Sequence, residues 1–490
     1  MSKFKLVLIL IVIVISSFTH FYQLDKTYIF QNDEGRDALI AFKMIDSGRP
    51  VLLGPETSVG NMYLGPFYYY LMVPSLILSQ LDPVGPAVMV AILGIFTTYL
   101  VYLLGKKSFN FSIGIIAALF YALSPIMVHH SRSSWNPNVI PFFVTLILLL
   151  PNFKKPIWQV CFGLLVGIIF QLHYVALILP GFIFLATSFD YLKNLQFKSF
   201  FGFCLMALVG FLISSSPFWL FEYRHNFVNS TAFITYLSNK TATSTIYPSF
   251  FARFSSNLRL LIDGVLYSSS LTPKISPLMT LAGIVLFLAS LIFSATRYTG
   301  LIFFSIFALS FLKENINVHY LAFLFPLVSV WFGSLFKSGK LLFISGVLLT
   351  IYFVFHFTPS HLYAFSQTEN AQVRRSQETA LYILQQANGR PYNVVGAQGT
   401  FTSTISYFLA TSDNPPRNDL QPLLFDICTG GPCKSDEETT VLLYLTGPSH
   451  PSLVDYLGHP AINEFTTPRK IIKNEWVTYD IYVATIELQP

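Results

Sequence analysis

Long apolar runs recur along this chain and leave few folds open to it. Runs of about 17 to 21 apolar residues occur between residues 4 and 357, and a helix of that length, rising about 1.5 Å per residue, matches the ~30 Å hydrocarbon layer of a bilayer. Only 11% of the 490 residues are charged, whereas soluble domains carry roughly 25%. Since the apolar excess has to face lipid, we predict a polytopic α-helical membrane protein.

The runs predict about eleven transmembrane helices. Their predicted bounds are residues 4–21, 84–104, 112–128, 138–151, 157–173, 175–190, 200–219, 276–295, 298–312, 318–336 and 340–357. No small-residue cleavage site follows the first run, so we interpret that run as a retained signal anchor. Residues 1–357 then form a transmembrane domain.

Lysines mark alternate connections between the predicted spans. They are Lys3, Lys5, Lys106, Lys107, Lys154, Lys155, Lys193, Lys198, Lys337 and Lys340. The positive-inside rule places them, and the amino terminus, on the cytoplasmic side of the plasma membrane. This topology requires that residues 66–81 do not cross the bilayer. That short stretch contains Pro74 and a tyrosine cluster suited to the headgroup layer, so we predict interfacial helices in a first outer loop, residues 22–83.

Polar residues become frequent from residue 358 to residue 490, where we predict a small extracytoplasmic α/β domain. Helical periodicity covers residues 369–386, and residues 392–395, 440–445 and 476–486 have strand patterns. Cys428 and Cys433 enclose two glycines and a proline, a spacing that predicts a structural disulfide in an oxidising compartment. The net charge of +6 is spread over short loops, which argues against a nucleic-acid partner.

Three acids gather in the first outer loop, at Asp33, Glu34 and Asp37. A carboxylate close to lipid has few waters around it and holds a proton more tightly, so it could accept one from a sugar or protein hydroxyl. The acids could equally form a solvated loop or the first turn of a helix, where Asp and Glu are favoured. The residues alone leave both interpretations open.

The order of several motifs extends the first interpretation. After Asp33-Glu34 come Gly-Pro-Phe-Tyr-Tyr-Tyr-Leu at 65–71, Val-Tyr-Leu-Leu-Gly-Lys-Lys at 101–107, Leu-Ser-Pro at 123–125 and Ser-Arg at 131–132. Over roughly residues 1–340, this order resembles the protein O-mannosyltransferase superfamily, which includes the bacterial aminoarabinose transferases and the RgtA/B/C/D-like enzymes. The resemblance implies a GT-C class glycosyltransferase of the cell envelope, with its active site at the outer membrane face and a polyprenyl-phosphate sugar as donor.

The resemblance also implies roles for residues of the first loop. Asp33 is the expected general base, with Glu34 beside it. We place Arg36 and Asp37 among the substrate-binding residues, and give Glu56 a supporting role in orienting the acceptor or holding the loop.

One departure concerns the loop after Ser131-Arg132, where many members carry a further acid. This chain has Trp135, Asn136 and Asn138 there instead. Amides cannot replace a charged carboxylate, but they can hydrogen-bond a sugar hydroxyl, and an indole offers a flat face to a pyranose ring. Trp135 could also be a plain interfacial anchor.

A departing lipid phosphate needs positive charge or hydrogen-bond donors near its bridging oxygen. The outer candidates are Arg132, which we rank first, Arg224, and the pair His319-Tyr320 at the start of a late span. His173 also falls at an outer helix end and is a candidate for lining the site.

The predicted reaction is transfer of a sugar to a hydroxyl of a glycan, lipid or protein acceptor, with inversion at the anomeric carbon. Asp33 takes the hydroxyl proton, and no second acid is needed because phosphate is already a good leaving group. Asp33 and Glu34 could instead share a divalent cation, Mg²⁺ or Mn²⁺.

Two other classes remain open. A transporter or flippase for lipid-linked sugars fits the number of spans, but carriers usually place ionisable groups within their spans. An O-antigen ligase or polymerase would use a large late loop, here residues 220–275.

Overall fold

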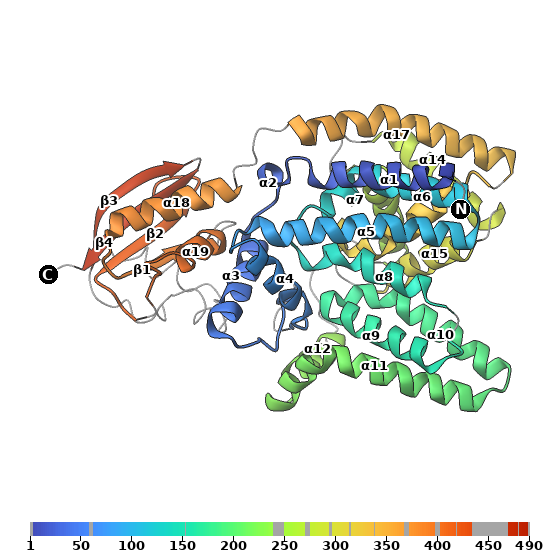
Figure 1. The fold of residues 1–490 in the computed structure, drawn as a ribbon, viewed down its shortest axis with the longest axis horizontal. Helices are drawn as coiled ribbons and strands as arrows, with labels where there is room; N and C mark the ends of the chain where they lie inside the picture. Colours follow the sequence, from blue (N-terminus) through green and yellow to red (C-terminus); the bar gives the residue numbers. More distant parts are fainter. Residues whose placement is uncertain are drawn as a thin grey trace. The chain divides into compact units, whose positions relative to one another are not determined.

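The computed structural model describes residues 3–57, 62–151, 153–238, 249–269, 275–293, 296–312, 315–337, 339–366, 372–396, 402–417, 419–433, 469–478 and 480–488. Helices dominate, and four strands follow near the carboxyl end (Figure 1). The chain divides into two compact units. The helical unit comprises Met1–Leu24, Val51–Tyr68 and Ala87–Gln367, and the α/β unit comprises Asp25–Pro50, Tyr69–Pro86 and Thr368–Pro490.

An apolar helix lies at each of the eleven predicted spans. These helices are α1 (Lys3–Phe21), α5 (Val84–Ser108), α6 (Phe111–Leu123), α8 (Ile140–Leu149), α9 (Pro156–Leu172), α10 (Ile178–Lys193), α11 (Phe197–Arg224), α14 (Pro277–Phe293), α15 (Arg297–Leu309), α16 (Phe325–Ser334) and α17 (Lys340–Ser366). Among the described residues, four segments are long and apolar enough to cross a membrane by length and composition, namely α1, α5, α11 and Tyr174–Lys193.

Short segments of 3-10 or π-helix stand beside several helices of this unit. They are η1 (Asn136–Val139) before α8, η2 (Tyr174–Leu177) before α10, the π-helix η3 (Leu261–Leu266) after α13, and η4 (Val318–Leu324) before α16. The turns η1, η2 and η3 all pack against η4. The predicted span 112–128 is broken at Ser124, because Pro125 cannot continue the hydrogen-bond ladder of α6 and instead begins α7 (Pro125–His130).

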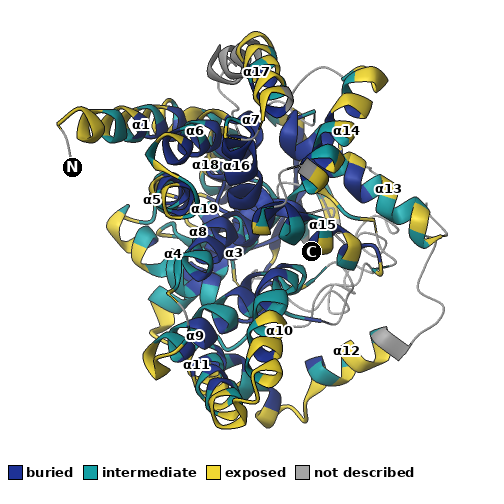
Figure 2. Cartoon of the chain, turned by 90° about the vertical axis from the view of Figure 1, so that its right-hand side faces the viewer, coloured by how far each residue is buried: buried dark blue, intermediate teal, exposed yellow. Residues whose placement is uncertain are grey.

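The centre of the helical unit is α16, every residue of which is buried. In Figure 2, α16 is dark blue, whereas α1 and α11 carry yellow, exposed positions. Many exposed positions of α1 and α11 are apolar, among them Phe4, Phe201 and Ile213. Apolar outward faces around a buried centre suit a lipid surrounding.

The connections also contain helices. They are α2 (Leu24–Thr27), α3 (Asn32–Ser47), α4 (Phe67–Leu78), α12 (Val228–Ser238) and α13 (Phe250–Leu260). The apolar helix α4 has 12 residues, a length of about 18 Å that is short of a bilayer crossing. The predicted loop 220–275 contains α12, α13 and η3. Helix α17 continues past the predicted boundary at residue 357.

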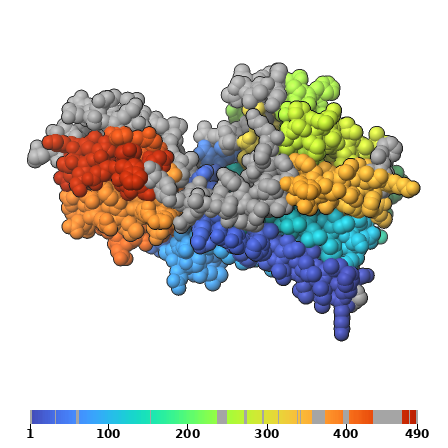
Figure 3. Space-filling model, turned by 90° about the horizontal axis from the view of Figure 1, so that it is seen from above, coloured from blue at the N-terminus to red at the C-terminus, as the bar shows by residue number. Residues whose placement is uncertain are grey.

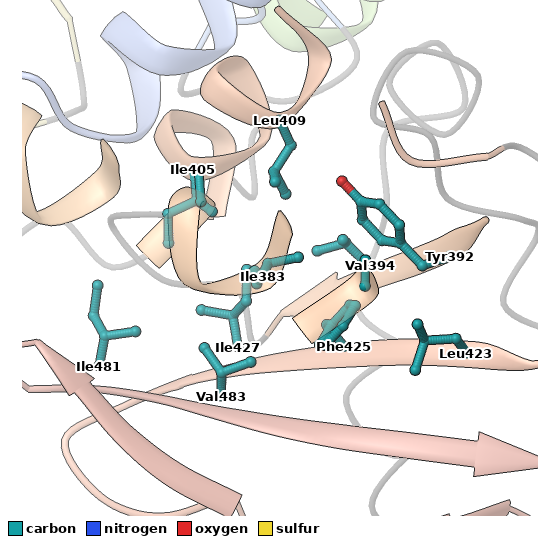
Figure 4. Close-up of a cluster of buried hydrophobic side chains, with 12 residues drawn as sticks. Ile383, Tyr392, Val394, Ile405, Leu409, Leu423, Phe425, Ile427, Ile481 and Val483 are labelled. Carbon is teal, nitrogen blue, oxygen red and sulfur yellow. The ribbon is translucent and has the colours of Figure 1, made fainter. Parts of the chain in front are cut away.

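The α/β unit is built on a four-stranded sheet of order β1-β2-β4-β3. Strand β1 (Tyr392–Gly396) pairs parallel with β2 (Leu423–Thr429), and β4 (Ile481–Leu488) pairs antiparallel with both β2 and β3 (Arg469–Thr478). Helices α18 (Gln372–Ala387) and α19 (Thr402–Ala410) share a buried apolar cluster with the sheet (Figure 4). In Figure 3, the red residues of β3 and β4 lie against darker orange residues of the same unit.

Three strand predictions have different outcomes. Residues 392–395 form β1, as predicted. The single strand predicted at 476–486 is wrong, because β3 ends at Thr478 and β4 begins at Ile481 to form an antiparallel pair. The strand predicted at 440–445 lies outside the described residues.

Candidate functional site

Helix α3 carries four of the five charged site residues predicted in the first outer loop, namely Asp33, Glu34, Arg36 and Asp37. Its first turn is fixed by a capping box, in which the Gln31 side chain accepts from the backbone of Glu34 and the Gln31 backbone N–H donates to Glu34 Oε2 at 3.1 Å. Such reciprocal bonds satisfy N–H groups that a helix start otherwise leaves open. Gly48 closes the helix in the left-handed conformation. Asp33, Glu34 and Asp37 therefore sit on a well-defined helix.

Arg36 joins two of these acids. Its Nη1 donates to Asp33 Oδ1 at 2.7 Å, while its Nε and Nη2 donate to Asp37 Oδ1 at 2.9 and 2.8 Å. The Tyr69 hydroxyl, from α4, donates to the same Asp37 oxygen at 3.2 Å. The result is a chain of contacts from Tyr69 through Asp37 and Arg36 to Asp33.

The two aspartates at the ends of this chain differ in exposure. Asp37 is fully buried, and burial raises its pKa to about 6 although Arg36 opposes the shift. The Asp33 side chain is 43% exposed, and its Oδ2 makes no hydrogen bond or ion pair with the described residues. A carboxylate held at one oxygen and open at the other can receive a proton from an incoming hydroxyl.

Glu34 is placed differently from Asp33. It is buried, and its Oε2 is engaged by the Gln31 N–H in the capping box. The Arg36 guanidinium at Asp33 Oδ1 would repel a metal ion nearby and so disfavours a cation shared by Asp33 and Glu34, which stays a prediction. Within the described ranges, the one group of three metal-ligating side chains is Asp426, Cys428 and Cys433, and a disulfide joins its two cysteines.

In the helical unit, four predicted residues form an aromatic cluster around η4. The ring centroids of Trp135 and His319 lie 4.5 Å apart, those of His173 and Tyr320 lie 4.8 Å apart, and His319 stacks on Tyr320 at 4.5 Å. All four are partly exposed. Trp135 and His173 occupy the N-cap positions of η1 and η2. The packing of these turns on η4 therefore brings together residues far apart in the sequence.

The two asparagines after Trp135 are used within the fold. Asn136 Nδ2 donates to the Leu172 carbonyl at 2.6 Å, and Asn138 Nδ2 donates to the Ser133 carbonyl at 2.9 Å. Both side chains are buried. Asn138 Oδ1 is buried without a hydrogen-bond partner in the described part of the chain. It can therefore accept a hydrogen bond from a hydroxyl group.

Arg132 has a structural task at the end of α1. Its Nη1 donates to the carbonyls of Thr19 and His20 at 2.8 and 3.2 Å, and its Nη2 donates to the Tyr22 carbonyl at 2.8 Å. A cation satisfying the last carbonyls of a helix is a favourable cap. Three of its five N–H groups are thereby committed.

The remaining predicted residues of the helical unit are Arg224 and Glu56. Arg224 is exposed at the end of α11. Glu56 is exposed and lies in an antiparallel bridge with Tyr63. The backbone N–H of Tyr63 donates a hydrogen bond to Asn229 Oδ1, and the Tyr63 carbonyl accepts one from the Tyr174 hydroxyl. Glu56 thus belongs to a loop that is fastened to α12 and η2.

The sequence did not single out Tyr69, whose hydroxyl orients Asp37, or Gly35, which lies against α19. Tyr69 was part of a tyrosine run that we assigned to the headgroup layer. Its partner follows only from tertiary structure, so no local pattern could have identified it.

The fold is that of the GT-C glycosyltransferases, a class of membrane enzymes. The chain is similar to ArnT, an aminoarabinose transferase, from Cupriavidus metallidurans: the structure of ArnT bound to undecaprenyl phosphate superposes with a TM-score of 0.57 and 15% sequence identity, over 99% of this chain and 98% of that one. The apo structure gives a TM-score of 0.58 and 13% identity, over 98% and 97%. No protein-family model matches the sequence, and no curated protein matches it either.

Proposed function

We propose that this protein is an integral membrane glycosyltransferase that moves a sugar from a polyprenyl-phosphate donor to an acceptor hydroxyl at the outer membrane face. The proposal is supported by the fold, which resembles that of an ArnT bound to undecaprenyl phosphate over nearly the whole length of both chains. The observation that carries the chemistry is the Asp33 carboxylate, held by Arg36 at one oxygen and exposed at the other.

Asp33 acts in the proposed reaction as the general base. The free oxygen of Asp33 takes the proton of the acceptor hydroxyl. At the same time the hydroxyl oxygen of the acceptor attacks the anomeric carbon, and the bond from this carbon to the phosphate oxygen breaks. Attack opposite the leaving phosphate inverts the anomeric centre. Arg36 holds the carboxylate in place by donating to its Oδ1.

The aromatic cluster of the helical unit is the proposed binding surface for the sugar. Trp135 offers a ring face, and Asn138 Oδ1 offers an acceptor. Because Arg132 already donates three hydrogen bonds to α1, we assign the donor phosphate first to Arg224 and to the His319-Tyr320 pair.

The test follows release of the carrier lipid, which needs no knowledge of the acceptor. Purified protein in nanodiscs is mixed with undecaprenyl phosphate bearing one radiolabelled hexose or pentose, with envelope extract as acceptor pool. Wild type should release undecaprenyl phosphate with transfer of label to the extract. Asp33→Asn should lose about two orders of magnitude in rate, and EDTA should leave the rate unchanged.

The matched control is Asp46→Asn, the same substitution at the exposed end of the same helix, which should keep the wild-type rate. Full activity of Asp33→Asn would remove the base assignment. Movement of intact donor across proteoliposome membranes, without transfer, would instead favour the flippase alternative.

A further inference from the structure

We propose that the carboxyl-terminal part of the chain positions the acid-bearing helix α3 for transfer, with Gly35 and Tyr407 as positioning residues. The proposal rests on the proposed function. It assigns to α18, α19 and the sheet a role that involves no contact with substrate. All of the contacts concerned lie within the α/β unit.

Helix α3 has two faces with different tasks. Asp33, Arg36 and Asp37 form the charged network described above. Gly35 and Phe42, two turns apart, both contact α19. Residues spaced by two turns lie on one side of a helix, so one face carries the acids and the other is docked on α19.

The docking is close at Gly35. A Cβ atom added there would lie 2.6 Å from the backbone nitrogen of Thr404 and 2.8 Å from its Cα. Backbone cannot rotate out of the way as a side-chain tip can, so any larger residue must push α3 away from α19. Thr404 in turn is held to α18 by a 2.7 Å hydrogen bond with Ser376.

Tyr407 fastens both segments of the first loop to α19. Its ring makes edge contacts with Phe30 and Phe42, with centroids 6.1 and 6.4 Å apart, next to and within α3. Its hydroxyl donates to the Leu81 carbonyl at 2.7 Å, within the segment Tyr69–Pro86. Tyr407 is fully buried. One side chain therefore anchors both the helix bearing Asp33 and the segment whose tyrosine orients Asp37.

Helix α19 is itself held on the sheet. Ile405 and Leu409 enter the buried cluster with Ile383 of α18 and Phe425 of β2 (Figure 4). The sheet, α19 and α3 thus form one packed series, and a displacement of α19 would carry Asp33 with it. A shift of about 1 Å in a reacting group can cost about 100-fold in rate.

The test compares Gly35→Ala, Tyr407→Ala and Tyr407→Phe in the full-length protein. Two properties are measured: kcat and KM for the undecaprenyl-phosphate donor, and hydrogen exchange of the amides of residues 32–47. Gly35→Ala and Tyr407→Ala should lower kcat by about tenfold or more, leave KM within about twofold, and accelerate exchange in α3. Tyr407→Phe keeps the ring and should fall between wild type and Tyr407→Ala.

Gly431→Ala is the matched control, because a Cβ added at Gly431 of the same unit meets nothing within 4 Å; both properties should stay at wild-type values. Retention of the Cys428–Cys433 disulfide checks that the unit is folded. Unchanged exchange in Gly35→Ala, or accelerated exchange with wild-type kcat, would overturn the positioning role. If the wild-type protein transfers no sugar, the proposed function itself is contradicted. That result is obtained before any variant is compared, so the two failures can be told apart.

Discussion

At the scale of single residues, the environment of each acid separates roles that the sequence left together. Asp33, Glu34 and Asp37 fall within five residues, and the sequence predicted them as a group of acids near lipid. Their difference arises from the rotation of α3. Asp37 is turned toward Tyr69, Glu34 toward the Gln31 backbone, and Asp33 keeps an open oxygen. That rotation is set by α19, far away in the sequence, so local patterns could not supply it.

A further buried acid, Asp426, predicts a pH effect on stability. Burial raises its pKa from 3.8 to about 6, with only partial compensation from the Ile427 N–H. The folded protein therefore binds more protons than the unfolded chain between these values, so the stabilisation is full below pH 4 and is lost as pH rises through 6. We expect the melting temperature of Asp426→Asn to exceed that of wild type at pH 7.5, by the equivalent of at most about 3 kcal/mol. The gap should narrow as pH falls and close below pH 4, whereas parallel curves would contradict the assignment.

At the scale of elements, apolar periodicity predicted the helices well because burial in lipid and burial in protein select the same residues. The eleven predicted runs each contain an apolar helix. The secondary-structure prediction failed for segments whose helix or strand state is decided by tertiary contacts. The strand pair β3 and β4 was taken as one strand, and neither β2 nor α19 was predicted, since their short apolar segments are ambiguous between helix and strand.

Helices α9 and α11 make a close pair whose basis is glycine. A Cβ on Gly163 would lie 1.9 Å from the Ala207 carbonyl oxygen, and one on Gly210 would lie 2.1 Å from the Val160 carbonyl oxygen. Small residues let helix backbones approach in membranes. Gly163→Leu should therefore separate the helices and lower the melting temperature by several degrees, while Gly181→Ala, where an added Cβ meets nothing within 4 Å, should not. Equal melting of the two variants would show that the close approach contributes little.

At the scale of the whole molecule, three of the predicted cytoplasmic lysines contact the ends of other helices in the helical unit. Lys5 of α1 lies over the Phe111 ring at the start of α6, and Lys337, after α16, lies over Phe109. Lys107 at the end of α5 donates to the Leu149 carbonyl at the end of α8. The structure thus gathers at one end of the bundle residues that the positive-inside rule assigns to one side of the membrane.

This arrangement predicts which positions an impermeant reagent can reach. With Cys161 and Cys204 changed to serine, the remaining cysteines are joined in a disulfide, so an introduced thiol is the sole target. In intact cells a membrane-impermeant maleimide should label Arg49→Cys, beyond α3, and should label Lys154→Cys only after permeabilisation. Both positions are exposed, so a difference reports the side of the membrane and not burial. The reverse pattern would place Asp33 in the cytoplasm, where the proposed acceptor chemistry at the outer face could not occur.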